Sequence, residues 1–189
     1  MATVLGLAPE VLSDIAQQIS NKLSKLGQIT LSSGQKLEIG ESFPVWMLPL
    51  SFATDPDPDT ILDRAAIQTG YWHHQIRHGG QAKEFATSRP LGPTATWRVE
   101  EIAESPLAEA IDVAVGILDQ QVLEEVPVRL LKIPSYLTEV FWIGAGPEAK
   151  ILVIRKPDTT STIDIGGIYP AGEFIRRLAQ NQFVIGPLP

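Results

Sequence analysis

The chain has 189 residues, no cysteine, and a formal net charge of −7 from 22 acidic and 15 basic residues. The lack of cysteine excludes disulfide bonds, thiolate catalysis and cysteine-ligated metal sites. The acidic balance argues against nucleic acid or anionic lipid as a partner. The start MATVLGLAPEVLSDIAQQ lacks the basic segment of a signal peptide, and no apolar run is long enough to span a membrane. We expect a single globular domain over residues 1–189, in the cytoplasm, without membrane insertion.

The first forty residues predict a helix followed by a hairpin. Apolar residues recur every three or four positions, as on the buried face of an amphipathic helix; they are Leu12, Ile15, Ile19, Leu23 and Leu26. Residues 28–40 then alternate between apolar and polar around Ser32-Ser33-Gly34, which favours a short hairpin. Helix and hairpin together, residues 9–40, are a candidate semi-independent subdomain.

A proline-braced aromatic segment follows at Phe43–Phe52. Pro44 and Pro49 exclude a helix interior, and they restrict any strand here to the edge of a sheet. Aromatic residues such as Trp46 are typical of a core, and a contact surface is the alternative that the sequence leaves open.

Residues 60–68 predict a short helix. Asp57 or Asp59 is placed to cap its start, and Gly70 is placed to end it.

All three histidines lie in the stretch YWHHQIRHGG, residues 71–80. In a helix, His74 and His78 would share a face, as in metal-binding helices, but the flanking glycines leave only about two turns. A hairpin turning at Gly79-Gly80 instead gives one apolar and one polar face on both strands at once. We therefore expect an antiparallel hairpin over residues 71–88, with His74 opposite Phe85 and with His73 and His74 on opposite faces. Such a pair cannot bind one metal ion.

The polar face of this hairpin is the candidate binding surface. It carries an aromatic ring, a titratable ring, an amide and both charge signs, in Tyr71, His73, Gln75, Arg77 and Glu84. That mixture suits recognition of a polar partner, and we expect the partner to be another protein or peptide, with no chemistry on this face. The alternative is an enzyme whose polar site on the 71–88 hairpin face assembles only in three dimensions, with His73 as a general base.

The second half of the chain alternates strands and helices. Residues 94–102 predict a strand, and residues 104–125 predict a helix that Ser105 caps and Pro106 begins. The expected inner stripe of this helix is Leu107, Ile111, Ala114, Leu118 and Val122, widened by Val113, Val115 and Ile117.

Three apolar runs then predict adjacent strands, of which at least the last two are antiparallel: VRLLKI at 128–133, LTEVFWI at 137–143 and KILVIRK at 150–156. An edge strand within 158–170 and a short helix at 171–182 complete the chain. Helices and hairpins are mixed without a regular βαβ alternation, which predicts the α+β class. We expect a largely antiparallel β-sheet built from hairpins and packed against two or three helices.

Two further motifs resemble ligand sites, and we interpret both as loops. IGAGPEA matches the glycine fingerprint of dinucleotide-binding folds, but Ala149 runs into a strand where that site needs a helix. DPDPDT resembles the opening of a calcium loop, but Thr60 and Ala66 stand where glycine and glutamate are required. The sequence therefore predicts no catalytic motif, no metal and no cofactor.

Overall fold

The computed structural model describes residues 6–25, 38–49, 57–78, 80–92, 96–121 and 126–181. The chain divides into two compact units, each assembled from separate stretches of sequence. Unit 1 contains Val45–Thr69 and Val113–Pro189, together with Met1–Val4, and unit 2 contains Leu5–Pro44 and Gly70–Asp112. The single domain expected over residues 1–189 stays a prediction.

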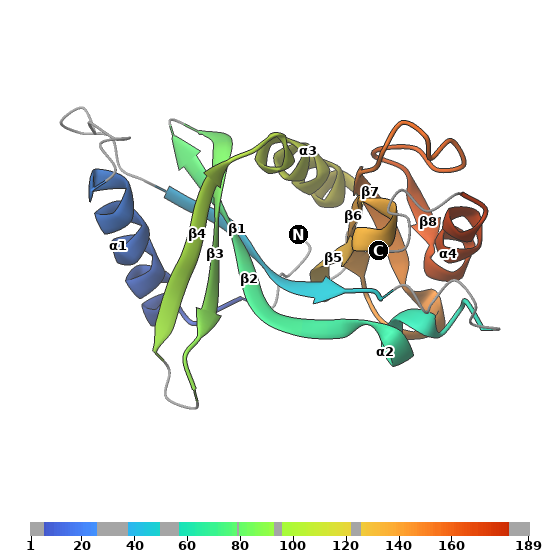
Figure 1. Cartoon of the computed structure of the whole chain (residues 1–189), viewed down its shortest axis with the longest axis horizontal. Helices are drawn as coiled ribbons and strands as arrows, with labels where there is room; N and C mark the ends of the chain where they lie inside the picture. Colours follow the sequence, from blue (N-terminus) through green and yellow to red (C-terminus); the bar gives the residue numbers. More distant parts are fainter. Residues whose placement is uncertain are drawn as a thin grey trace, which may run out of the picture. The chain divides into compact units, whose positions relative to one another are not determined.

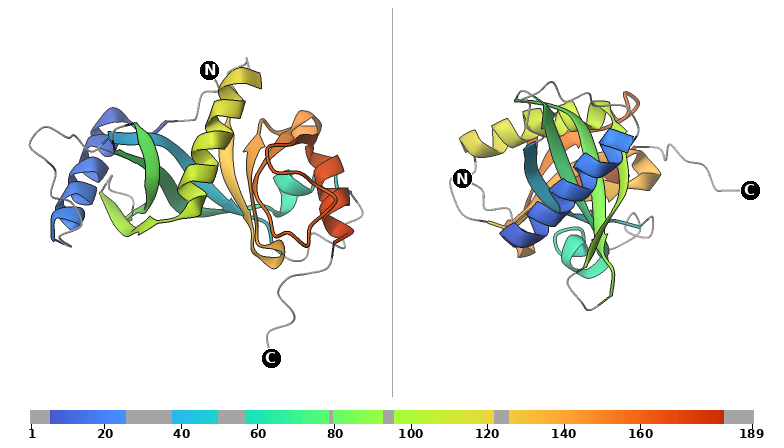
Figure 2. Two further views of the ribbon diagram at one scale, coloured as in Figure 1. Left: turned by 90° about the horizontal axis from the view of Figure 1, so that it is seen from above. Right: turned by 90° about the vertical axis from the view of Figure 1, so that its left-hand side faces the viewer.

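Within the described residues, unit 2 contains two complete strands, one complete helix and parts of two further strands and one further helix. They are α1 (Pro9–Lys25), β2 (Ile67–His78, from Gly70 on), β3 (Gln81–Pro90), β4 (Trp97–Glu104), the first part of β1 (Glu38–Met47) and the start of α3 (Pro106–Gln121). Helix α1 lies across the strands (Figure 2) and buries the predicted stripe of Ile15, Ile19 and Leu23. These side chains pack against Ile76, Ala86 and Val99 from β2, β3 and β4. The predicted N-terminal helix is confirmed, whereas Leu26 and most of the predicted 28–40 hairpin lie outside the described residues.

Strand β4 is an edge strand, and side chains of α1 cover its outer backbone. Gln18 Nε2 donates to the Trp97 carbonyl at 2.9 Å, and the Val99 N–H donates to Gln18 Oε1 at 3.1 Å. Lys22 Nζ donates to the Val99 carbonyl one helical turn further on. The Gln18 amide therefore occupies the place that a peptide group of a neighbouring strand would take, which protects the edge from pairing.

We expect Gln18→Met to expose this edge while keeping the volume of the side chain. Losing the two hydrogen bonds to β4 and the exposed bond to Asp14 should lower the free energy of unfolding by about 1–3 kcal/mol, and the open edge should promote self-association. Chemical denaturation and light scattering at rising concentration measure the two effects. Gln17→Met, one position along the same helix and exposed, is the control. Equal scattering from both variants would mean that Gln18 does not protect the edge.

The predicted hairpin is confirmed by antiparallel pairing of β2 with β3; Gly79 in its turn lies outside the described residues. The two pairs next to the turn follow the expected register, and an extra residue on β3 then shifts all later pairs by one position. Glu84 consequently lies opposite Ile76, and Phe85 lies opposite Gln75 instead of His74. The register prediction was wrong beyond the turn because a β-bulge leaves no mark in the alternation of side chains.

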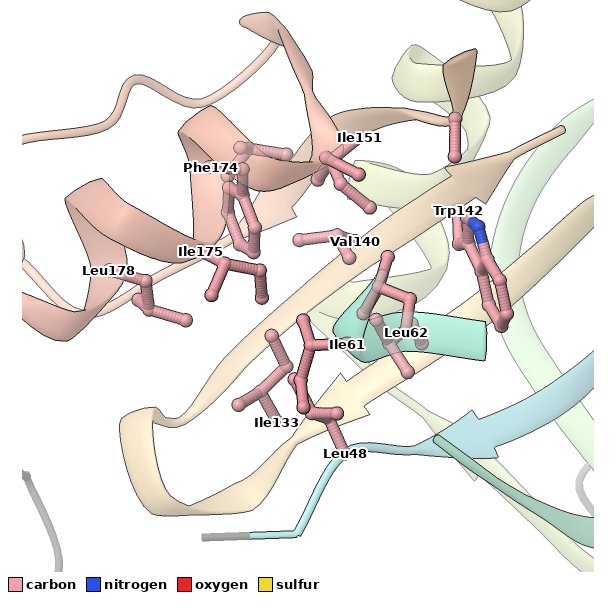
Figure 3. Close-up of a cluster of buried hydrophobic side chains, with 14 of the residues drawn as sticks. Leu48, Ile61, Leu62, Ile133, Val140, Trp142, Ile151, Phe174, Ile175 and Leu178 are labelled. Atoms are coloured by element: carbon pink, nitrogen blue, oxygen red, sulfur yellow. The ribbon is translucent and has the colours of Figure 1, made fainter. Parts of the chain in front are cut away.

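Unit 1 contains the three predicted apolar strands and a small helical layer (Figure 1). Its elements are α2 (Ile61–Ala65), β5 (Val128–Ile133), β6 (Thr138–Ile143), β7 (Lys150–Arg155), β8 (Ile168–Pro170) and α4 (Ala171–Ala179), with the ends of β1, β2 and α3. A core of apolar side chains from α2, α4 and the sheet fills the space between them (Figure 3). Residues at alternate strand positions, such as Leu130, Phe141 and Leu152, are also fully buried. Burial on both faces explains why these strands are continuous apolar runs.

The strand order is β4-β3-β2-β1-β5-β6-β7-β8. The register of β1 with β5 is parallel, and those of β2–β3, β3–β4, β5–β6, β6–β7 and β7–β8 are antiparallel. The predicted α+β class, with a largely antiparallel sheet and packed helices, is therefore confirmed. No helix within the described ranges is long and apolar enough to cross a lipid bilayer.

Two predictions about the segment before the hairpin were wrong. Pro44 lies within β1, which is a central strand and not an edge. The pairing of β1 with β5 begins only at Val45, so the missing N–H of Pro44 removes no hydrogen bond to β5. Helix α2 begins after Thr60, which makes no side-chain cap hydrogen bond, so neither Asp57 nor Asp59 is the cap residue. The helix ends at Ala65, and Gly70, with a φ of 77°, lies inside β2.

Helix α3 confirms most of its predicted pattern. The Leu107 N–H donates to Ser105 Oγ at 3.2 Å, which is the expected cap. The predicted inner residues Leu107, Ile111, Ala114, Val115 and Leu118 are buried. Val113 was wrongly added to this stripe, since it is 67% exposed; Val122 lies outside the described residues.

Candidate functional site

Most of the hairpin face predicted as a contact surface is buried. His73 and Gln75 are fully buried, whereas Tyr71 at the start of the face is 37% exposed. Gln75 Nε2 donates to the Ala108 carbonyl at 2.9 Å, so the first turns of α3 cover this face. Glu84 lies on the opposite face, because the bulge pairs it with Ile76. The structure therefore brings His73, Gln75 and Arg77 together beneath α3 and separates Tyr71 and Glu84 from them.

His73 and Arg77 each make close contacts with neighbouring side chains. The His73 ring stacks on Phe85, with centroids 4.8 Å apart and an interplanar angle of 21°. Arg77 Nη2 lies 2.9 Å from Glu41 Oε2 and 2.6 Å from Asp112 Oδ1. Burial lowers the pKa of Arg77, but the bond to Asp112 and the charge of Glu41 outweigh it, so that the pKa is raised. Such an ion-paired arginine is bound to its own chain and is a poor anchor for a partner.

His74 is the centre of a second buried polar group. Its Nδ1 lies 2.8 Å from Ser42 Oγ and its Nε2 lies 2.7 Å from Ser88 Oγ. The ring is fully buried, and burial lowers the pKa of His74 to about 4. The imidazole is consequently neutral at physiological pH, with both nitrogens bound to serine hydroxyls, as a structural histidine requires.

The described residues offer no cluster of three or more His, Asp or Glu side chains able to hold a metal ion. In the DPDPDT segment, Asp57 accepts a hydrogen bond from Thr60 and Asp59 pairs with Arg176. In the IGAGPEA segment, the chain passes through one short 3-10 turn, Gly146–Glu148, and enters β7. A helix that would hold a pyrophosphate does not follow these glycines, and the segment is a hairpin loop.

A different group of residues, in unit 1, has the composition of a binding site. The guanidinium of Arg129 on β5 lies 4.2 Å from the ring centroid of Trp142 and 5.7 Å from that of Trp46. Strand pairing creates this arrangement: Arg129 lies directly opposite Trp142 on β6, and β1 brings Trp46 to the other side of β5. The two indoles meet edge to face, with centroids 5.5 Å apart. We call Arg129, Trp46 and Trp142 the Arg–Trp site.

Arg129 is half-buried without a counterion. Its Nη1 donates to the Gly144 carbonyl at 2.6 Å, and among the described residues it forms no ion pair. Burial lowers the pKa of Arg129, and the charge of Asp63 opposes that shift from a distance. Asp63 itself accepts a hydrogen bond from the Gly146 N–H at 2.9 Å. A cation that is partly desolvated and has no counterion destabilises the isolated protein, and a bound anion would offset this desolvation cost.

The sequence held only a faint signal of this site. Arg129 and Lys132 interrupt the apolar run VRLLKI, and a cation within a buried strand is unusual. The sequence leaves Trp46 either in the core or on a contact surface, and the structure places it partly buried against the core. Trp142 is 2% exposed and lies beside Leu62 in the core cluster (Figure 3). Their convergence on Arg129 depends on the parallel pairing of β1 with β5, which periodicity does not reveal.

Comparison with known proteins adds no assignment to this geometry. The chain matches no family model, and no curated protein and no solved structure is significantly similar to it.

Proposed function

We propose that the protein is a non-catalytic binding or accessory protein, and that it contacts another protein through the Arg–Trp site. The observation that supports this proposal is the half-buried guanidinium of Arg129, which has indole rings beside it and no carboxylate partner among the described residues. Arginine and tryptophan are the residues most enriched at the energetic centres of protein interfaces. The net charge of −7 disfavours nucleic acid as the partner. We place this role in the cytoplasm, which suits a chain without cysteine.

The original candidate surface contributes little to this proposal. Of its residues, Tyr71 is exposed, and Arg89 lies over its ring at 5.8 Å. His73 and Gln75 are buried, so neither side chain lies on a surface that a partner or a substrate can contact. No observation on the described residues therefore supports the alternative of an enzyme with its site on the 71–88 hairpin face. We assign the proposed binding role to the Arg–Trp site of unit 1 instead.

We expect Arg129→Met to change the free energy of unfolding by no more than about 1 kcal/mol. The variant loses the bond to Gly144, but it also removes the desolvation penalty of an unpaired cation, and a thioether packs well against indoles. Denaturant titration of both proteins measures the difference. A loss of about 3 kcal/mol or more would assign Arg129 to the fold and not to binding.

The same variant tests the proposed function. In quantitative affinity capture from the source organism, the wild type and Arg176→Met should retain a common partner that Arg129→Met loses. Arg176 is the matched control, because it is an exposed arginine of the same unit that is already paired with Asp59. Retention of every captured protein by Arg129→Met would contradict the proposal.

A further inference from the structure

We propose that the Arg–Trp site recognises a carboxylate, presented by an acidic residue of the partner protein. This inference rests on the proposed function and names the chemical group that is bound. Three observations support the inference: the hydrogen-bond donors that Arg129 leaves unused, the indole rings that contact its guanidinium, and the charge of Asp63.

The first argument concerns the donors of Arg129. Nη1 is bound to the Gly144 carbonyl, and none of the guanidinium nitrogens is a buried donor without a partner. The remaining N–H groups are therefore accessible from solvent. Nε and Nη2 form a planar fork whose spacing matches the two oxygens of a carboxylate, which makes bidentate binding possible.

The second argument concerns preorganisation. The Arg129 guanidinium is held by the Trp142 ring at 4.2 Å and by the bond to Gly144 at 2.6 Å. Trp142 is fixed in turn by its burial and by its edge-to-face contact with Trp46. A long side chain that is already immobilised loses little conformational entropy when it binds. Trp46 is only partly buried and offers a ring to an apolar neighbour of the acidic residue.

The third argument concerns which anion is favoured. Asp63 is exposed, is anchored by the Gly146 N–H, and acts electrostatically on Arg129. Its negative charge weakens the attraction that Arg129 exerts on any anion. The cost of desolvating a phosphate dianion is much larger than that of desolvating a carboxylate monoanion, so the weakened attraction offsets it less well. Arg129 with Asp63 nearby therefore favours a carboxylate over a phosphorylated side chain.

The test uses three capped peptides that differ at one position: acetyl-Ala-Glu-Leu-amide, its Gln counterpart and its phosphoserine counterpart. Nuclear magnetic resonance of the ¹⁵N-labelled full chain follows the Arg129 Nε–H and the indole N–H signals. The Glu peptide should shift the Arg129 and Trp46 signals saturably, and the Gln peptide should bind about ten times more weakly or not at all. Arg129→Lys should lose about ten-fold in affinity for the Glu peptide, whereas Arg176→Lys should keep it.

Asp63→Asn provides an independent check of selectivity, since an asparagine side chain still accepts the Gly146 bond. It should increase the affinity for the phosphoserine peptide by a larger factor than the affinity for the Glu peptide. Equal binding of the Glu and Gln peptides, or stronger binding of the phosphoserine peptide to the wild type, would overturn the carboxylate inference. If partner capture still depends on Arg129 in that case, the proposed function holds and only the carboxylate inference is wrong. If capture does not depend on Arg129, the proposed function and the carboxylate inference are both wrong.

Discussion

Replacing Phe174 by alanine is expected to lower the free energy of unfolding by about 3–5 kcal/mol. Phe174 is the aromatic residue by which α4 enters the core of unit 1, and it is fully buried (Figure 3). The alanine variant loses the transfer free energy of the ring and leaves a cavity, because the surrounding β-sheet cannot collapse into the space. Denaturant titration with a probe of global unfolding measures the loss.

A matched control separates burial from simple loss of apolar atoms. Ile165, which lies in the same unit, is 63% exposed, and Ile165→Ala should change the free energy of unfolding by about 0.5 kcal/mol or less. If Phe174→Ala costs no more than Ile165→Ala, then α4 does not pack on the sheet as the structure describes.

The second large effect concerns acid. We expect the protein to lose about 3 kcal/mol of stability through His74 alone as the pH falls from about 6.5 to about 4. An unfolded histidine takes up its proton near the ordinary pKa of 6.5, whereas burial lowers the pKa of His74 in the folded protein to about 4. Between these values the unfolded state binds more protons than the folded state, so its free energy falls relative to the folded one. The contribution is fully present above about pH 6.5 and lost below about pH 4.

The comparison that isolates this effect is His74→Gln, whose amide can bond to Ser42 and Ser88 but does not titrate. The other two histidines and all carboxylates are common to both proteins. Denaturant titrations at several pH values should therefore show that the free energy of unfolding of the wild type falls by about 3 kcal/mol relative to that of the variant from pH 7 to pH 4. A difference that stays constant over this range would show that His74 is not buried in its neutral form.

Local signals in the sequence were sufficient for the elements and the fold class. Ser105 and Pro106 marked the start of α3, and the period of its apolar residues marked the buried side from Leu107 to Leu118. The glycine pair placed the turn between β2 and β3, and three apolar runs gave β5, β6 and β7. In each case, one short stretch of chain carries the information, because turn chemistry and side-chain period are local properties.

The site could not be predicted, because exposure is decided by elements that are distant in sequence. Gln75 looks like a solvent-facing residue of a strand, yet Ala108 accepts its hydrogen bond and α3 covers it. Arg77 looks like a free cation, yet Glu41 and Asp112 neutralise it from β1 and α3. Arg129 shows the converse, since an apolar run suggests burial but its guanidinium is only half-buried and unpaired within the described part of the chain.

The bonds from Gln18 and Lys22 to the edge of β4 have a consequence for how the chain is made. Gln18 and the Trp97 carbonyl that it binds are 79 positions apart in sequence. During synthesis, α1 therefore leaves the ribosome long before the strand that it protects exists. Conversely, any fragment that begins after α1 contains β4 with its outer hydrogen-bonding groups uncovered. Loss of the N-terminal helix by proteolysis or by an internal translation start would thus convert a protected strand into a template to which other chains can attach.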